Sequence, residues 1–439
     1  MYSYVIRITV LPYGWLPLIT VQMKNSAQVI SFIGNNIMSE LITTPAAPPE
    51  STLPAKMVFT LAAGAGLSVA SIYYSQPMLS MMGQNMQATP ASVGMIPTLT
   101  QAGYALGILL LVPLGDRYDR RTIILLKSIL LAVALLFCSI EPAINGLLVA
   151  SLFTGVAATM AQDIVPASAI LAPASQRGKT VGTVMTGLLV GILLSRVISG
   201  FVAEYFGWRV MYQLAAGSVA LIGLALWRVL PRFAPASRLN YASLLLSMHH
   251  LWQRYPTLRR AAIAQGLLSL AFSAFWSTLA MMLNDTYHLG SAVAGAFGLA
   301  GAAGALAAPL AGAMADKTGP ARVTQFGAGL VMISFAAMFL LPLLPAQGQL
   351  ALIVISAIGF DLGIQATLVA HQTLVYGLEP AARGRLNALL FTLVFIGMSA
   401  GAALGSLALE KGGWPAVVLL ATVASAASLL VRLLSRRLH

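Results

Sequence analysis

Three ionisable residues stand inside long apolar stretches of the sequence: Asp163, Arg196 and Asp361. If these stretches cross a membrane, each charge costs about 2.5–3.5 kcal/mol on insertion scales, so each residue is a candidate for function. An aspartate in such a place can carry a proton, and a nearby arginine favours the charged form of its carboxyl group until the two groups separate. The chemistry indicated is proton transfer.

Helical spacing places Asp163 and Arg196 at similar heights. Asp163 lies fourteen residues before Arg177, or about 21 Å along a helix, and Arg196 lies seventeen after Lys179, or about 25 Å. The spacing predicts an Asp163–Arg196 pair. One interpretation is structural, in which the charges neutralise each other so that both tolerate burial. The other makes Asp163 a proton carrier controlled by Arg196.

Asp361 and His371 have different expected roles. Asp361 lies twenty-two residues before Arg383, about 33 Å along a helix, which favours an external gate or a helix end over proton transfer. His371 is nearer mid-depth, where a histidine either packs with a hydrogen bond or titrates in the physiological range.

Aromatic and amide side chains at comparable heights predict a cavity for a moderately polar organic molecule. Tyrosine and tryptophan also favour membrane interfaces, which is the alternative explanation. The candidate cavity residues are Tyr73, Tyr74, Gln76, Gln101, Tyr104, Gln162, Trp276, Asp361, Gln365 and His371.

Composition identifies the elements that must position these residues. The chain has 439 residues, of which 58 % are hydrophobic and 8 % charged, with a mean hydropathy of +0.85. A soluble domain has about 25 % charged residues, so this chain cannot cover a water-facing surface. A single cysteine and five scattered histidines predict neither a metal site nor a cofactor.

Apolar runs of the length needed to cross a bilayer as helices predict an all-α polytopic membrane protein with twelve spans. The spans are expected at 57–80, 92–114, 122–140, 145–171, 181–203, 210–230, 261–283, 291–314, 323–344, 350–374, 386–408 and 415–434. Alternate connections hold the basic residues, whereas MGQNMQATP, SIEPAIN, NDTYHLG and LPAQGQ hold none. This pattern places both termini in the cytoplasm. We expect the protein to lie in a bacterial inner membrane. The net charge of +13 therefore reflects topology, not a nucleic-acid partner.

Residues 1–55 are predicted to form a disordered N-terminal extension. Segment 43–56 is proline-rich, and the apolar stretch 4–21 is interrupted by Arg7, Pro12 and Pro17, unlike a signal peptide. We expect Met38 to be the natural start.

An internal repeat divides the remainder. VPLGDRYDRR follows the second span, and MADKTGPAR follows the eighth, about two hundred positions later. The sequence therefore predicts two pseudo-symmetric six-helix halves, 56–230 and 261–439, joined by a cytoplasmic linker at 231–260. Such halves around a central site are the plan of a secondary transporter.

The repeated loop resembles the signature of the major facilitator superfamily, G-x-x-x-D-R/K-x-G-x-x-R/K. SIYYSQPML, TQAGYALGILLLVPLGDR, FGWR and RGRLNALLF are similar to its arabinose-efflux and drug–proton antiporter branch. In the first copy, Val112 and Asp119 stand where the signature has glycines, whereas the second copy keeps both as Gly312 and Gly319. If the loop needs a tight turn at Asp119, the first copy makes the looser contact and Asp119→Gly shifts the conformational balance.

The resemblance implies a gate in which Asp116 meets the start of span eleven near Arg383, and Asp316 meets the start of span five near Arg177. A carboxylate is stabilised at a helix N-terminus by roughly 0.3–1 kcal/mol. The alternative is a solvated turn whose charges only set topology. The expected gating residues are Asp116, Arg117, Arg120, Arg121, Arg177, Asp316, Lys317, Arg322 and Arg383.

The resemblance implies a monomeric secondary active transporter that exports a small organic solute in exchange for protons by alternating access. Sugars, nucleosides, drugs or similar metabolites are the candidate solutes. The alternatives are a proton symporter or uniporter for uptake, and a non-transporting sensor on the same fold. No phosphate-binding loop or catalytic constellation occurs, so we expect no enzyme.

Overall fold

The computed structural model describes residues 5–9, 18–22, 53–234, 240–301, 311–315, 317–379 and 382–434. The chain divides into two units, Met1–Ser51 and Thr52–His439. In the first, strands β1 (Val5–Thr9) and β2 (Leu18–Gln22) pair antiparallel, with Val5 opposite Gln22. This ribbon was not expected in an extension predicted to be disordered, although its β-branched residues suit strands.

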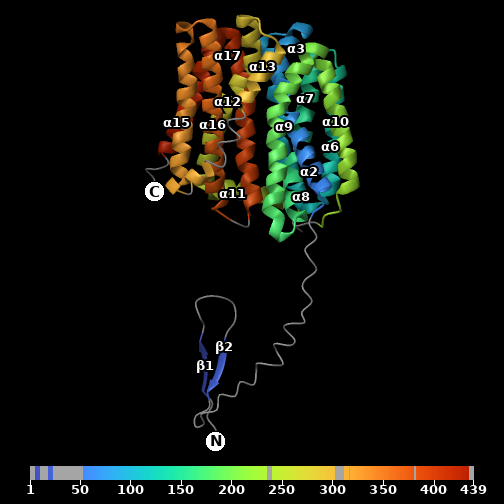
Figure 1. Cartoon of the computed structure of the whole chain (residues 1–439), viewed down its shortest axis with the longest axis vertical. Helices are drawn as coiled ribbons and strands as arrows, with labels where there is room; N and C mark the ends of the chain where they lie inside the picture. The colour runs from blue at the N-terminus through green and yellow to red at the C-terminus, as the bar shows by residue number, and fades with distance from the viewer. Residues whose placement is uncertain are drawn as a thin grey trace. The chain divides into compact units, whose positions relative to one another are not determined.

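The second unit is helical throughout its regular elements, as the sequence predicted (Figure 1). The first half comprises α2 (Ala55–Ala70), α3 (Leu79–Met86), α4 (Pro90–Leu111), α5 (Leu114–Arg117), α6 (Arg120–Ile140), α7 (Ile144–Ala158), α8 (Met160–Leu171), α9 (Arg177–Phe206) and α10 (Trp208–Val229). The linker forms α11 (Tyr241–Arg254), and the second half comprises α12 (Pro256–Tyr287), α13 (Ser291–Phe297), α15 (Pro320–Ala337), α16 (Ala346–Tyr376) and α17 (Arg383–Leu434). Short 3₁₀ segments at Gln76–Met78, Ala174–Gln176, Gly298–Gly301 and Met338–Leu343 extend neighbouring helices.

The helices account for the twelve expected spans. Nine helical stretches among the described residues are long and apolar enough to cross a membrane. One of them, α17, contains two spans, since Gly413 breaks its helical backbone at φ 65°. The shorter helix α2 and the stretch 291–301 correspond to spans one and eight.

Span one, expected at 57–80, is interrupted in the structure. Helix α2 ends at Ala70, a turn follows, and a 3₁₀ segment containing Pro77 leads into α3. Proline lacks the backbone N–H of a regular helix, which explains the interruption just before it. Tyr73 and Tyr74 therefore lie in a turn inside the bundle.

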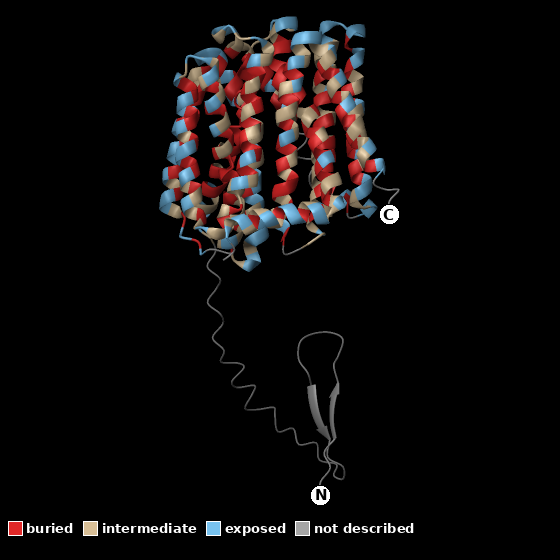
Figure 2. Cartoon of the chain, turned by 180° about the vertical axis from the view of Figure 1, so that it is seen from behind, coloured by how far each residue is buried: buried red, intermediate tan, exposed pale blue. Residues whose placement is uncertain are grey.

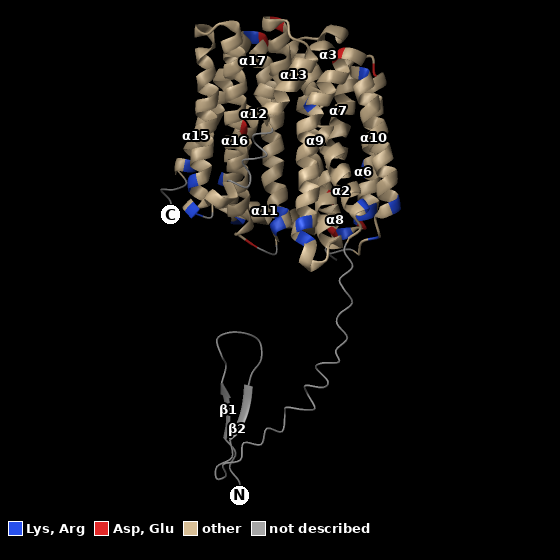
Figure 3. Ribbon diagram, in the orientation of Figure 1, with Lys and Arg blue, Asp and Glu red and all other residues tan. Residues whose placement is uncertain are grey.

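The surface and interior have the distribution expected in lipid. Large apolar side chains such as Leu126, Ile129, Phe326 and Ile333 are exposed on the flanks, whereas buried residues concentrate between the helices (Figure 2). Lys and Arg gather at one end of the bundle, near α8 and α11 (Figure 3). We call this the basic end and the other the far end.

One apolar core is centred on the first half and also includes residues of α12, α16 and α17, and a second core lies within the second half. The halves meet closely toward the far end. Helix α4 packs on α17, and α9 packs on α13. Glycines permit both approaches: a Cβ at Gly94 would overlap Ser406, and one at Gly200 would overlap Ser291. Ser399 also donates a 2.9 Å hydrogen bond to Thr98 O across this interface.

Candidate functional site

A cavity of about 480 Å³ lies between the halves. Its inner wall includes Tyr73 and Phe272, whereas Asp116 and Arg385 line it at the basic end. The tight α4–α17 and α9–α13 contacts lie toward the far end. The cavity therefore extends to one end of the bundle.

Four of the expected cavity residues line it: Tyr73, Tyr104, Gln162 and Gln365. Six do not contribute to this wall: Tyr74, Gln76, Gln101, Trp276, Asp361 and His371. Sequence inspection missed Gln265, Phe272, Gln372, Tyr376 and Asn387, which do. The signal available was the recurrence of amides in spans seven, ten and eleven.

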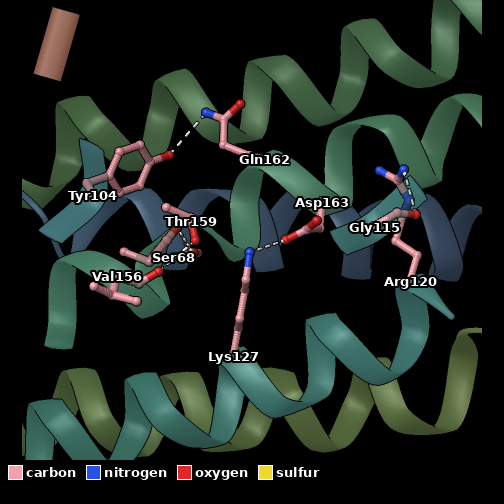
Figure 4. A network of polar contacts seen from close by, with 10 residues as sticks. Ser68, Tyr104, Gly115, Arg120, Lys127, Val156, Thr159, Gln162 and Asp163 are labelled. Atoms are coloured by element: carbon pink, nitrogen blue, oxygen red, sulfur yellow. Dashed lines mark hydrogen bonds and ion pairs between the residues drawn. The ribbon is translucent and has the colours of Figure 1, made fainter. Parts of the chain in front are cut away.

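Polar contacts organise the wall within and between the halves. Gln162 Nε2 donates to Tyr104 Oη at 3.1 Å (Figure 4). The Tyr104 ring lies 4.3 Å from that of Phe395 in the other half. Ser273 donates to Gln101 Oε1 at 2.9 Å, again across the interface. Gln101 is therefore a buried tie between the halves.

The closest buried ion pair joins Lys127 to Asp163. Lys127 Nζ lies 2.6 Å from Asp163 Oδ2, and the side chains are 6 % and 0 % exposed (Figure 4). Asp163 Oδ1 has no hydrogen-bond partner. The predicted Asp163–Arg196 pair is wrong, because Lys127 on α6 takes the place assigned to Arg196.

Asp163 lies beside the loop motif, nearer the basic end than the helical spacing from Arg177 predicted. A Cβ added at Gly115 would lie 3.1 Å from Asp163 Oδ1 and 3.4 Å from Arg120 Nη2. Arg120 also donates to Gly115 O at 3.2 Å. The height estimate failed because only eight residues of α8 follow Asp163, which is about 12 Å of helix.

Arg196 occupies a different cluster, toward the far end. Its Nε donates to Gln76 Oε1 at 2.8 Å, and its guanidinium carbon lies 4.4 Å from the Trp276 ring centre, 4.9 Å from Tyr73 and 5.5 Å from Phe272. Such contacts are cation–π interactions, strongest when desolvated. Asp361 on α16 is its electrostatic neighbour.

The motif residues lie at the basic end without the contacts implied by the resemblance. Asp116 Oδ1 pairs with Arg120 Nη2 at 3.3 Å, and Arg383 Nε donates to Tyr376 O at 3.2 Å. Asp116 lines the same cavity as Gly384, and a Cβ at Gly384 would meet nothing within 4 Å. The expected gate contact is thus replaced by open space.

The remaining gating candidates that the structure describes also lie at the basic end. Arg121 Nη2 donates to Trp227 O at 2.6 Å, and Arg117 lies over the Tyr118 ring. Arg177, Lys317 and Arg322 are exposed, and Asp316 lies outside the described residues.

Asp119 is not a solvated substitute for glycine. Its Oδ1 accepts hydrogen bonds from Arg121 N at 3.0 Å and from Phe233 N at 2.9 Å, which caps α6 and holds the start of the linker. The backbone allows this residue because its φ is −56°, whereas Gly319 at the corresponding place has φ 87°. The two copies of the motif therefore turn differently.

We expect Asp119→Ala to lower the thermal stability of the purified protein, since losing an N-cap costs about 0.5–2 kcal/mol. Asp119→Asn keeps an acceptor oxygen and is the matched control, expected to melt close to wild type. Equal melting temperatures for the Ala and Asn variants would contradict the capping role.

His371 is buried and hydrogen-bonded within the second half. Its Nδ1 lies 2.9 Å from Gln265 Oε1, whose side chain in turn lines the cavity. This contact favours the packing interpretation over direct exposure to solute.

The linker helix α11 and its neighbour contact the second half at the basic end. Arg385 Nη1 donates to Ser247 Oγ at 2.8 Å, and Tyr255 Oη donates to Glu379 Oε2 at 2.9 Å. The hydrogen bond to Glu379 raises the pKa of the Tyr255 phenol above its usual value.

Among the described residues, no group of three or more His, Cys, Asp or Glu side chains could hold a metal ion.

Known proteins resemble this chain in sequence and in fold. The model of the family described as Major Facilitator Superfamily matches residues 61–376. The chain is 37 % identical to the "Uncharacterized transporter YgaY" of Escherichia coli O157:H7, over 87 % of this chain and 96 % of that protein. It is 32 % identical to the "Probable transporter SCO4007" of Streptomyces coelicolor, over 80 % and 81 %. The structure of a bacterial homolog of the human lysosomal transporter Spinster, in an inward-facing and unoccupied conformation, superimposes with a TM-score of 0.68 at 16 % identity, over 88 % and 96 %.

Proposed function

Because the chain belongs to the major facilitator superfamily and is a secondary transporter, we propose that it exports a small organic solute in exchange for protons. The observation that carries the proposal is the buried Lys127–Asp163 pair, which lies beside both the motif turn and the cavity wall. The arabinose-efflux and drug-antiporter resemblance of the sequence supports the same reaction.

The pair provides a group that can take up a proton and change the gate. Protonation neutralises the Asp163 carboxylate and removes its attraction to Lys127 and to the nearby Arg120. Arg120 also contacts Asp116, the carboxylate expected to clamp the basic end against α17. Proton uptake at Asp163 is therefore coupled, through Arg120, to the turn that closes this end.

Topology supports the assignment of the two ends of the bundle. Basic residues gather at the end to which the cavity extends, and the positive-inside pattern assigns that end to the cytoplasm. We propose that solute enters the cavity from the cytoplasm and that the far end faces the outside, with both termini in the cytoplasm. Spans one to six and seven to twelve would then rock about the cavity.

The test is proton movement in proteoliposomes that hold a pH-sensitive dye. A panel of labelled sugars, nucleosides, amphiphilic drugs and organic acids is presented with and without an imposed pH gradient. We expect at least one solute to move protons in the opposite direction. Co-directional movement would establish a symporter, solute flux without protons a uniporter, and absence of any flux would contradict transport; each result overturns the proposal.

A further inference from the structure

The Arg196 cluster is a buried cationic site that the proton-coupling pair does not explain. Arg196 is 3 % exposed, yet no carboxylate of the described residues lies within the 4.0 Å that defines an ion pair with it. Among the described residues, its one side-chain hydrogen-bond partner is the neutral amide of Gln76. A buried cation of this kind is costly, so its presence indicates a role in binding.

Unused hydrogen-bond donors converge beside the guanidinium. Arg196 Nη2 and Gln76 Nε2 are buried and have no hydrogen-bond partner. Both side chains line a second, small cavity of about 10 Å³, together with Trp276 and apolar residues. That space is comparable to one water-sized sphere. Because Gln76 Oε1 already accepts from Arg196, this cavity offers N–H groups that require an acceptor oxygen.

The site adjoins the large cavity through aromatic rings. Tyr73 and Phe272 line the large cavity and also lie against the Arg196 guanidinium, at 4.9 and 5.5 Å. A solute could therefore place an anionic group at Arg196 and its remaining atoms against these rings. Most of the large-cavity wall is apolar, with amides and tyrosines interspersed, which suits an apolar body.

Asp361 supplies the negative charge that neutralises Arg196 from a distance while the site is empty. A Cβ added at Gly301 would lie 2.9 Å from Asp361 Oδ2 and 4.0 Å from Arg196 Nη1, so the two groups approach the same point on the chain. Arg196 belongs to the first half and Asp361 to the second. Separation of the halves at this end would draw the carboxylate away and leave the guanidinium for another anion.

We propose that Arg196 and Gln76 bind a carboxylate of the transported solute, with Asp361 as the competing internal anion. The solute is then a monocarboxylate with an apolar or aromatic body. This inference rests on the proposed transport function and names its substrate class. In the present conformation the rings of Tyr73 and Phe272 stand between the large cavity and Arg196, so a solute in that cavity reaches the site when these two side chains move.

Paired ligands isolate the contribution of the charge. The purified full-length protein is titrated with phenylacetate, indole-3-acetate and hexanoate, each against its primary amide, and thermal unfolding is followed. We expect at least one acid to raise Tm while its amide does not. Arg196→Gln should weaken binding of that acid by roughly 10- to 100-fold, as for loss of a charged hydrogen bond. Arg196→Lys should retain part of the affinity.

Two further variants complete the design. Arg209→Gln is the matched control, since Arg209 also lies over a tryptophan, Trp208 at 4.2 Å, but lines neither cavity. It should bind as wild type does. Asp361→Asn removes the competing carboxylate and should tighten binding several-fold.

Three results would overturn the inference: no acid distinguished from its amide by wild type, unchanged affinity in Arg196→Gln, or equal losses in Arg196→Gln and Arg209→Gln. Failure here is separable from failure of the proposed function. If proteoliposomes exchange protons for neutral solutes independently of Arg196, the transporter assignment stands and the carboxylate site does not.

Discussion

Asp163→Asn is expected to abolish proton-coupled flux while leaving the protein folded. Asparagine has nearly the same shape as aspartate and can accept a hydrogen bond from Lys127, but it cannot take up a proton at physiological pH. The solute-dependent change of pH inside proteoliposomes, reported by the dye, measures the effect. Asp285→Asn is the matched control, because Asp285 is exposed on α12, and it should retain coupling. Coupled flux at wild-type rate in Asp163→Asn would remove Asp163 as the carrier.

Stability separates a carrier from a structural pair. Lys127→Met leaves Asp163 buried without its partner and is expected to destabilise the protein by about 3–5 kcal/mol. The double variant Lys127→Met with Asp163→Asn removes both charges of the pair and should recover most of that loss. If it recovers stability but not proton coupling, the pair acts in transport. Recovery of both would show that the ion pair is only structural.

Gly200→Leu is expected to shift the protein toward a conformation that is open at the far end. A Cβ at Gly200 already overlaps Ser291 of α13, so a leucine cannot be accommodated while α9 and α13 remain packed. Overpacking of this kind costs about 1–3 kcal/mol, which corresponds to a population shift of roughly 5- to 150-fold. The overpacking destabilises only the conformation that is closed at the far end, because α9 and α13 separate when that end opens.

Cysteine reactivity measures that shift in the purified protein. The single native Cys138 is buried and is first replaced by Ser. A cysteine at Ala294, which is 4 % exposed in the small cavity, should become more reactive in Gly200→Leu, whereas one at Gly384 by the large cavity should become less so. Gly217→Leu is the matched control, because a Cβ there meets nothing within 4 Å. Parallel changes at both sites would indicate general unfolding and contradict alternating access.

The sequence by itself determined the class of fold, because that outcome depends on local and additive quantities. Apolar length, the scarcity of charge and the repeated loop motif each act within one span or one connection. The same reasoning identified Asp163, Arg196 and Asp361, since a charge in hydrocarbon is conspicuous wherever the helix packs. It also selected Tyr73, Tyr104, Gln162 and Gln365 among the cavity residues.

Only the tertiary structure decided which of these residues meet. Asp163 pairs with Lys127, which was not among the residues selected from the sequence, because the rotation of α6 about its axis points Lys127 inward. Arg196 lies among aromatic rings and beside Asp361, since the α9–α13 interface brings spans from different halves together. A residue's height along its helix can be predicted from the sequence only as accurately as the end of that helix. The direction in which a side chain points, and the neighbour that it finds, depend on the packing of distant helices.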